Sequence, residues 1–186
     1  MTTATIETVK DLSGTYTLDP SHSRVGFVAR HAMVAKVRGA FNEVSGTATI
    51  DGANPSASTL QVSIQAGSVD TRDANRDGHL VSPDFLDVAN YPTITFTGTG
   101  FTIVDDETVE VTGDLTIKDV TKPVTIPFTF GGAATDPFGN ARVGFEGSVV
   151  VNRKDWGLTW NAALETGGVL VSEKVTLEFE VSAIAA

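Results

Sequence analysis

The residues best suited to bind a metal ion lie between residues 73 and 84. Asp73, Asn75 and Asp77 alternate with other residues, Gly78 follows directly, and five residues separate Gly78 from Asp84. This spacing matches an EF-hand calcium loop, with Asp in place of the final Glu. The EF-hand loop lies between two helices, whereas here a strand-like stretch precedes it and no long helical pattern follows. We therefore expect no metal site, but a charged helical turn that is capped by Asp73 and ended by Gly78.

Three histidines are the other candidates for metal binding or acid–base chemistry. His22, His31 and His79 come from separate stretches, and no pair has the spacing of a known zinc site. Asp19, Ser21 and His22 supply the residue types of a catalytic triad, but neighbours on an extended turn cannot stack nucleophile, base and orienting acid. The sequence predicts no catalytic residues and no enzyme. Acid–base catalysis by His31 or His79 stays open as the alternative.

Composition limits the class of protein. The chain has 186 residues, no cysteine and a net charge of −10, which fits one domain without disulfides or thiolate metal sites. Its basic residues are scattered, which disfavours nucleic-acid binding. No apolar run approaches the roughly 20 residues that a membrane-spanning helix needs, and the first residues lack a signal-peptide pattern. We expect a soluble, cytoplasmic protein in which residues 1–13 form a flexible arm.

Most of the chain alternates apolar and polar residues with the period of a half-buried β-strand. The alternating stretches lie within residues 24–31, 39–51, 59–69, 93–101, 109–117, 124–130, 141–153 and 174–181. About eight such stretches predict an all-β fold, and closure into an eight-stranded antiparallel barrel would remove the exposed sheet edges. A slip in the alternation predicts a bulge at Asn42-Glu43. Residues 32–38 could form one helical turn.

Two irregular segments interrupt this pattern. Ser68–Phe96 carries charges, prolines and bulky apolar residues, and long connections inside compact β domains tend to be functional. We expect this segment to form a lid with a short helix over one end of the barrel. Residues 154–172 contain Trp156 and Trp160, which could plug a barrel end or line a ligand mouth.

Glycines stand at inward positions of several predicted strands, where a packed core would favour larger side chains. Glycine inside a strand marks a bend of the sheet or a close approach by a ligand or another group. Both interpretations stay open for these positions: Gly39, Gly46, Gly113 and Gly147.

Five stretches occur in an order that resembles the YceI-like family. They read DPSHS, VGFVARHAMVAKVRGAFNEVSGT, SVDTRDANRDGHLVSPDFLDVANYPTITF, VTGDLTIKDVTKPVTI and NRKDWGL. The resemblance covers about Gly14 to Ile184 and implies a YceI-like domain over residues 14–186. It implies a lipocalin-like, eight-stranded antiparallel barrel with a long internal apolar pocket. It also implies binding of a polyisoprenoid lipid or an isoprenoid quinone, for storage or transport.

If that resemblance holds, inward side chains and the two irregular segments should line the pocket. The expected apolar lining is Val25, Phe27, Phe41, Leu60, Ile64, Leu80, Phe85, Phe96, Leu115, Ile117, Phe128, Phe145, Val149, Trp156 and Trp160. The expected contacts to a polar head group near a mouth are His31, Arg38, Arg72, Asn75 and His79. We expect a long-chain amphiphilic lipid as the partner and no cofactor, and the sequence allows a homodimer. A solid barrel that serves only as an interaction scaffold is a further alternative.

Overall fold

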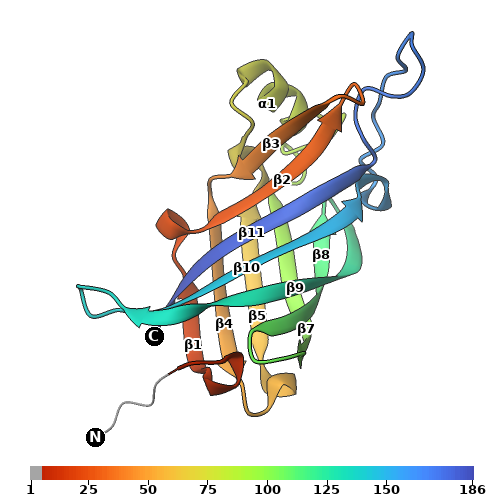
Figure 1. Cartoon of the computed structure of the whole chain (residues 1–186). Helices are drawn as coiled ribbons and strands as arrows, with labels where there is room; N and C mark the ends of the chain where they lie inside the picture. The colour runs from red at the N-terminus through yellow and green to blue at the C-terminus, as the bar shows by residue number, and fades with distance from the viewer. Residues whose placement is uncertain (1–5) are drawn as a thin grey trace, which may run out of the picture.

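The structure, a computed structural model, describes residues 6–186 and consists mainly of one antiparallel sheet (Figure 1). Eleven strands belong to this sheet. They are β1 (Ser13–Leu18), β2 (Arg24–His31), β3 (Ala35–Phe41), β4 (Val44–Asp51), β5 (Thr59–Gln65), β6 (Val69–Asp70), β7 (Thr93–Ile103), β8 (Thr108–Ile117), β9 (Val120–Thr135), β10 (Ala141–Asn152) and β11 (Lys174–Ala185). The α-helix α1 spans Ala74–Val81. Short 3-10 helices cover Val9–Asp11, Pro20–His22, Pro55–Ala57, Ala66–Ser68 and Arg153–Trp156.

The sheet closes on itself and forms the predicted eight-stranded antiparallel barrel. The ring runs β1-β4-β5-β7-β8-β9-β10-β11, and β11 pairs back with β1 from Tyr16↔Ala185 to Leu18↔Ala183. Closure satisfies the backbone groups that an open sheet would expose at its edges. The largest core cluster lies inside this ring and includes Ile94, Phe96, Leu115 and Ile126.

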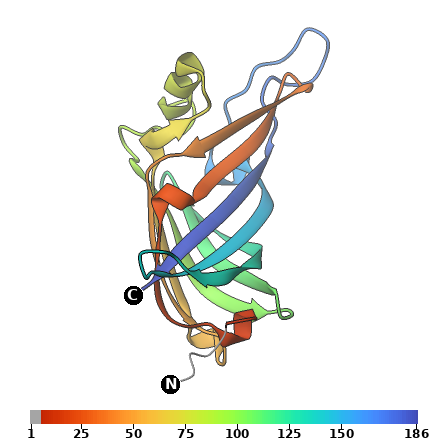
Figure 2. The same cartoon turned by 60° about the vertical axis from the view of Figure 1, so that its left-hand side comes forward.

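Strands β2, β3 and β6 extend the wall of the barrel at one end (Figure 2). The last residues of β11 pair with β1, whereas Thr176–Glu180 pair with β2. Strands β3 and β4 follow one another with a break at residues 42–43, the position at which the alternation slips. The chain there leaves the strand entirely, and the Asn42 N–H donates to the carbonyl of Ser68 at 3.1 Å.

The prediction of a helical turn in residues 32–38 is wrong. Ala35–Phe41 forms β3 and pairs with β2 from Val25↔Phe41 to His31↔Ala35. Ala32 and Met33 have φ values of 50° and 66° and make the tight turn between the strands. Such a pair of positive φ values matches the right-handed twist of a hairpin. Strand β3 pairs with β2 along its whole length, whereas one helical turn would leave most of its backbone N–H and C=O groups without a hydrogen bond.

Residues 6–13 pack against the barrel, which differs from the expected flexible arm. The Thr8 hydroxyl accepts from the N–H of Lys10, and Asp11 accepts from the N–H of Thr8, so the N-terminus of the 3-10 helix has a complete capping box. Val9 and Leu12 are 3% and 2% exposed. Their burial makes residues 6–13 part of the barrel end, while residues 1–5 of the expected arm lie outside the described residues.

Helix α1 stands over the barrel end that β2 and β3 extend (Figure 1). The Asp73 carboxylate accepts from the N–H groups of Asn75 and Arg76, so the predicted N-cap is confirmed. Gly78 does not end the helix as predicted, because the helix continues to Val81 and Ser82 caps it. Leu80, two residues beyond the predicted end, thus belongs to the helix and lines the cavity. Within residues 6–186, no helix has the length and apolar character needed to cross a bilayer.

Candidate functional site

The barrel encloses an apolar cavity of about 340 Å³. Because successive side chains of a strand point to opposite faces, every second residue of the ring strands faces this space. Leu60 and Ile64 of β5, for example, line the cavity. The cavity reaches from the lid residue Leu80 to Leu12 at the other end of the barrel. Among the lining residues, burial raises the pKa of the Tyr16 phenol, which is consistent with a dry interior.

Most side chains that the sequence assigned to an apolar pocket do line this cavity. They are Val25, Phe27, Phe41, Leu60, Ile64, Leu80, Phe85, Phe96, Leu115, Ile117, Phe128, Phe145 and Trp156. Val149 is not among the lining residues and packs against the core cluster beside them. Trp160 lies on the lid, with its ring centroid 4.5 Å from that of His79 and 5.5 Å from that of Phe85.

Several lining residues were not assigned to the pocket from the sequence. Some continue the inward alternation of their strands, as Ile94, Val111 and Phe179 do, so the pattern that predicted their neighbours could have found them. Val9 and Leu12 also line the cavity. They lie in a short segment without strand or helix periodicity, which explains why sequence patterning missed them.

Lid and barrel wall are joined through the buried residue Thr71. Asp77 of α1 accepts hydrogen bonds from the Thr71 N–H and hydroxyl at 2.9 and 2.6 Å. The Arg76 side chain donates to the Thr71 hydroxyl and carbonyl, both at 2.8 Å. Thr71 directly follows β6, which pairs with β3. These bonds hold α1 so that Leu80 and Phe85 face the cavity.

Local hydrogen bonds account for the three carboxylates of the calcium-like pattern. Asp73 caps α1, Asp77 binds Thr71, and Asp84 lies 2.9 Å from Nε2 of His79. The carboxylates therefore serve separate local contacts instead of converging on one point. Across residues 6–186, His, Asp and Glu do not gather in any group of three or more that could hold a metal ion.

None of the predicted head-group residues lines the cavity. His31, Arg72 and Asn75 are exposed. Arg38 lies on the outer wall, 3.7 Å from a carboxylate oxygen of Glu178. His79 contacts Asp84 and the ring of Trp160. The structure thus brings the apolar part of the predicted site together, and leaves its polar part on the outside.

Among the lining residues of the described chain, two are charged, Asp51 and Arg153, and Arg153 belongs to the NRKDWGL stretch. Asn152 caps the 3-10 helix Arg153–Trp156, and Gly157 ends it with φ 78°, a conformation that glycine adopts without strain. This single turn buries Arg153 and Trp156 and exposes the two residues between them. The Trp156 indole donates to the Leu115 carbonyl at 2.9 Å. Arg153 was not predicted as a site residue, because an isolated Arg at a strand end carries no periodic signal.

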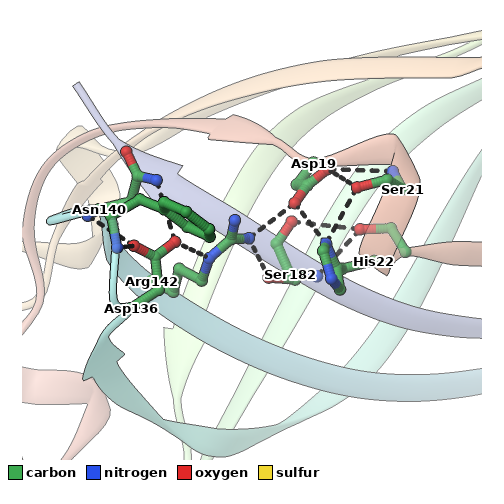
Figure 3. A network of polar contacts seen from close by, with 9 residues as sticks. Asp19, Ser21, His22, Asp136, Asn140, Arg142 and Ser182 are labelled. Carbon is green, nitrogen blue, oxygen red and sulfur yellow. Dashed lines mark hydrogen bonds and ion pairs between the residues drawn. The ribbon is translucent and has the colours of Figure 1, made fainter.

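Asp19, Ser21 and His22 lie together on the surface, but their geometry is not that of a catalytic triad (Figure 3). The same ring atom, Nδ1 of His22, lies 2.8 Å from Asp19 and 3.0 Å from the Ser21 hydroxyl. A triad needs the acid on one ring nitrogen and the nucleophile on the other. Arg142 bridges Asp19 and Asp136 at 2.7 and 2.8 Å and holds the pKa of both carboxyls well below the usual range. The cluster is therefore a brace between the Pro20–His22 turn and the β9–β10 hairpin.

The inward glycines make room for phenylalanine rings. A Cβ at Gly39 would overlap the ring of Phe27, and a Cβ at Gly113 would overlap the ring of Phe96. At Gly147 it would meet the ring of Phe128 at 2.8 Å. Rings that lie over glycines stay close to the wall, which leaves space at the centre of the barrel. Close approach by an aromatic ring therefore accounts for Gly39, Gly113 and Gly147, whereas no ring atom is among the nearest neighbours of Gly46.

Comparison with known proteins gives the family. The model of the YceI-like domain matches residues 16–183. This chain belongs to the YceI-like family. A UPF0312 protein of Pseudomonas savastanoi pv. phaseolicola is 38% identical over 158 residues, which cover 84% of this chain and 82% of the relative.

Solved structures share the YceI-like barrel. BcnA of Burkholderia cenocepacia matches with a TM-score of 0.78 and 24% identity, over 89% of this chain and 98% of its own. A polyisoprenoid binding domain from Saccharophagus degradans, implicated in plant cell wall breakdown, matches with a TM-score of 0.70 and 18% identity, over 92% and 98%. At these identities the likeness shows the fold alone.

Proposed function

We propose that this YceI-like barrel binds a long-chain isoprenoid lipid, a polyprenyl chain or an isoprenoid quinone, and shields it from water for storage or transport. The observation that carries the proposal is the apolar cavity inside a closed barrel, which runs from the lid to the opposite end. A largely apolar, enclosed space suits a ligand whose surface is mostly hydrocarbon. The neighbour described as a polyisoprenoid binding domain supports the same ligand class.

The chain of such a ligand would supply most of the affinity. Burying one five-carbon isoprene unit contributes on the order of 4 kcal/mol before any cost is counted. A few units therefore approach the strongest non-covalent affinities, about 18–21 kcal/mol. Ordering the flexible chain and the protein offsets much of this gain. Chain length and shape should consequently dominate selection among ligands.

Alternation along β5 offers a matched pair of variants to test the proposal. Leu60 faces the cavity, whereas the preceding Thr59 is exposed. Leu60→Trp should block uptake of added polyprenyl chains, and Thr59→Trp should leave it unchanged. Uptake is measured by native mass spectrometry and by organic extraction followed by lipid analysis. If wild-type protein neither retains a lipid nor takes up any added prenyl chain, the proposal is wrong.

The alternative of an enzyme that acts on such a lipid has a direct test. Turnover of a prenyl or quinone substrate that His31→Ala or His79→Ala abolishes, with the fold intact, would support it. Neither histidine lines the cavity, so no contact in the structure favours this alternative. The cytoplasmic location and the homodimer stay predictions from the sequence.

A further inference from the structure

Arg153 places a positive charge in the wall of the cavity. The residue is only 6% exposed. Its Nε donates to the Ser172 carbonyl at 2.8 Å, Nη1 to the Leu158 carbonyl at 2.6 Å, and Nη2 to the Val171 carbonyl at 3.3 Å. These bonds tie the start of the 3-10 helix to the segment before β11. Arg153 therefore has a structural role, but that role does not use all of its donors.

A guanidinium carries one N–H on Nε and two on each Nη. The three bonds use one hydrogen on each nitrogen. Within residues 6–186, one N–H of Nη1 and one of Nη2 are thus left without a protein acceptor. The ring of Phe85 lies beside the group, with its centroid 5.9 Å from the guanidinium carbon. An aromatic face stabilises a cation, but it does not replace a hydrogen-bond acceptor.

No carboxylate of residues 6–186 forms an ion pair with the Arg153 guanidinium either. Glu173 lies nearby, since its backbone carbonyl accepts from the Arg153 N–H at 2.9 Å, but its carboxylate lies 2.7 Å from the Lys154 ammonium on the exposed side. Burial lowers the pKa of the Arg153 guanidinium, and the distant charge of Glu173 offsets this only in part. Proteins rarely bury a charge without an ionic partner, because desolvation is costly. A partner that arrives with the ligand would account for this arrangement.

We propose that Arg153 binds the head group of the ligand, and that this head group presents an oxygen acceptor, with an anionic oxygen preferred to a neutral carbonyl. The inference rests on the proposed function, since it assigns the polar end of the same site. The lipid chain then lies along the apolar cavity, and its head lies at the lid end beside Phe85 and Trp156. The proposal thus assigns the head-group contact to Arg153 instead of to the residues outside the cavity that the sequence suggested.

Three ligands of equal prenyl length test the assignment: the bare hydrocarbon, the quinone and the monophosphate. A hydrogen bond to a charged group in a buried site should favour the monophosphate over the hydrocarbon by about 10- to 150-fold. The quinone should fall between them, because charge-assisted bonds are about twice as strong as neutral ones. Since a buried pair is screened little by salt, the ratio should persist at 0.5 M NaCl.

In Arg153→Met, the three affinities should become equal within about threefold, a difference of less than 1 kcal/mol. A purely structural Arg153 would instead change all three affinities by the same factor. Arg38→Met is the matched control, because Arg38 is an exposed arginine of the same wall, and it should keep the wild-type ratio. A wild-type ratio near one, or a ratio that survives in Arg153→Met, overturns the head-group assignment while hydrocarbon binding still upholds the proposed function.

A crystal structure of the wild-type protein with the monophosphate gives a decision that does not depend on the folding of any variant. We expect a phosphate oxygen within hydrogen-bond distance of Nη1 or Nη2 of Arg153. A chain in the cavity with its head elsewhere would refute the assignment and leave the proposed function standing. Failure of all three ligands to bind would refute both.

Discussion

Gly39→Ala tests whether glycines keep the barrel open by letting phenylalanine rings lie against the wall. Gly39 and Phe27 are direct partners across β2 and β3. A methyl group at Gly39 would overlap the Phe27 ring and would lie 2.9 Å from Cγ2 of Thr71. All of these obstructing atoms belong to side chains, so the backbone can stay in place. We expect the Phe27 ring to tilt into the cavity and Thr71, which holds the lid, to be pushed aside.

The expected loss of stability follows from these contacts. Overpacking a core by one methyl group costs about 1–3 kcal/mol, and the lower chain entropy of Ala in the unfolded state returns about 0.4–1 kcal/mol. The net destabilisation should be roughly 1–2 kcal/mol, which for a chain of this size lowers Tm by roughly 2–8 °C. Thermal unfolding followed by circular dichroism measures this directly. Prenyl uptake should fall as well, because the tilted ring occupies the cavity.

Gly46→Ala is the matched control, since Gly46 is a second inward strand glycine and lines the cavity itself. Its added methyl group would meet no ring, and its nearest neighbours would be the Gln61 carbonyl at 3.3 Å and Val62 Cγ2 at 3.4 Å. The change in Tm should stay within roughly 3 °C.

Phe27→Leu completes a double-mutant cycle. A shorter side chain removes the overlap, so Gly39→Ala should cost at least 1 kcal/mol less in the Phe27→Leu background than in wild type, a coupling typical of residues in contact. The reasoning fails if Gly39→Ala is as stable as Gly46→Ala, or if its cost is the same in both backgrounds.

Three further predictions concern the lid, the surface brace and the buried indole. Leu80→Asp should reduce retention of prenyl chains at least tenfold, because it puts a carboxylate in the apolar cavity. Asn75→Ala, on the exposed side of α1, should leave retention unchanged. Equal retention in the two variants would show that Leu80 does not belong to the site. Arg142→Met should lower Tm at pH 7 and should lower it less at pH 2.5. Arg142 lowers the folded pKa values of Asp19 and Asp136, so the ionised carboxylates stabilise the fold fully above the unfolded carboxyl pKa of about 4. This stability is lost progressively as pH falls toward the lowered folded pKa values. A difference in Tm that stays constant with pH would contradict the brace. Trp156→Phe should cost about 1–3 kcal/mol because the buried Leu115 carbonyl loses its donor, whereas the half-buried Trp160→Phe should cost less in the same denaturant titration.

The wall of the barrel could be predicted because one physical signal specifies it. A strand with one face in the core and one in solvent alternates in sequence, so Leu60, Phe96 and Leu115 could be assigned to the interior without coordinates. The outcome at Val149 shows the limit of that signal. It packs against the core cluster without lining the cavity, and alternation does not report which inward residues reach the central space.

The polar part of the site could not be predicted for a different reason. Exposed residues such as Arg72 and Asn75 were expected to contact a head group because they lie in the lid segment near a mouth of the pocket, whereas Arg153 stands alone at the end of β10. Its significance depends on three carbonyls at residues 158, 171 and 172, and only the folded chain brings these together. The same holds for Val9 and Leu12, whose burial depends on the barrel end that receives them.

The change of partner along β11 explains how the lid is attached over the cavity. Because β11 pairs first with β2 and then with β1, strands β2, β3 and β6 extend the wall at the lid end beyond the closed ring. Only two residues of β6 pair with β3, and Thr71, with the bonds from Asp77 and Arg76, follows them at once. The lid is therefore fastened to the barrel by a short ladder and one buried threonine. Thr71→Val keeps the shape of the side chain but removes its hydroxyl. It should consequently speed the release of a bound prenyl chain while lowering Tm only a little.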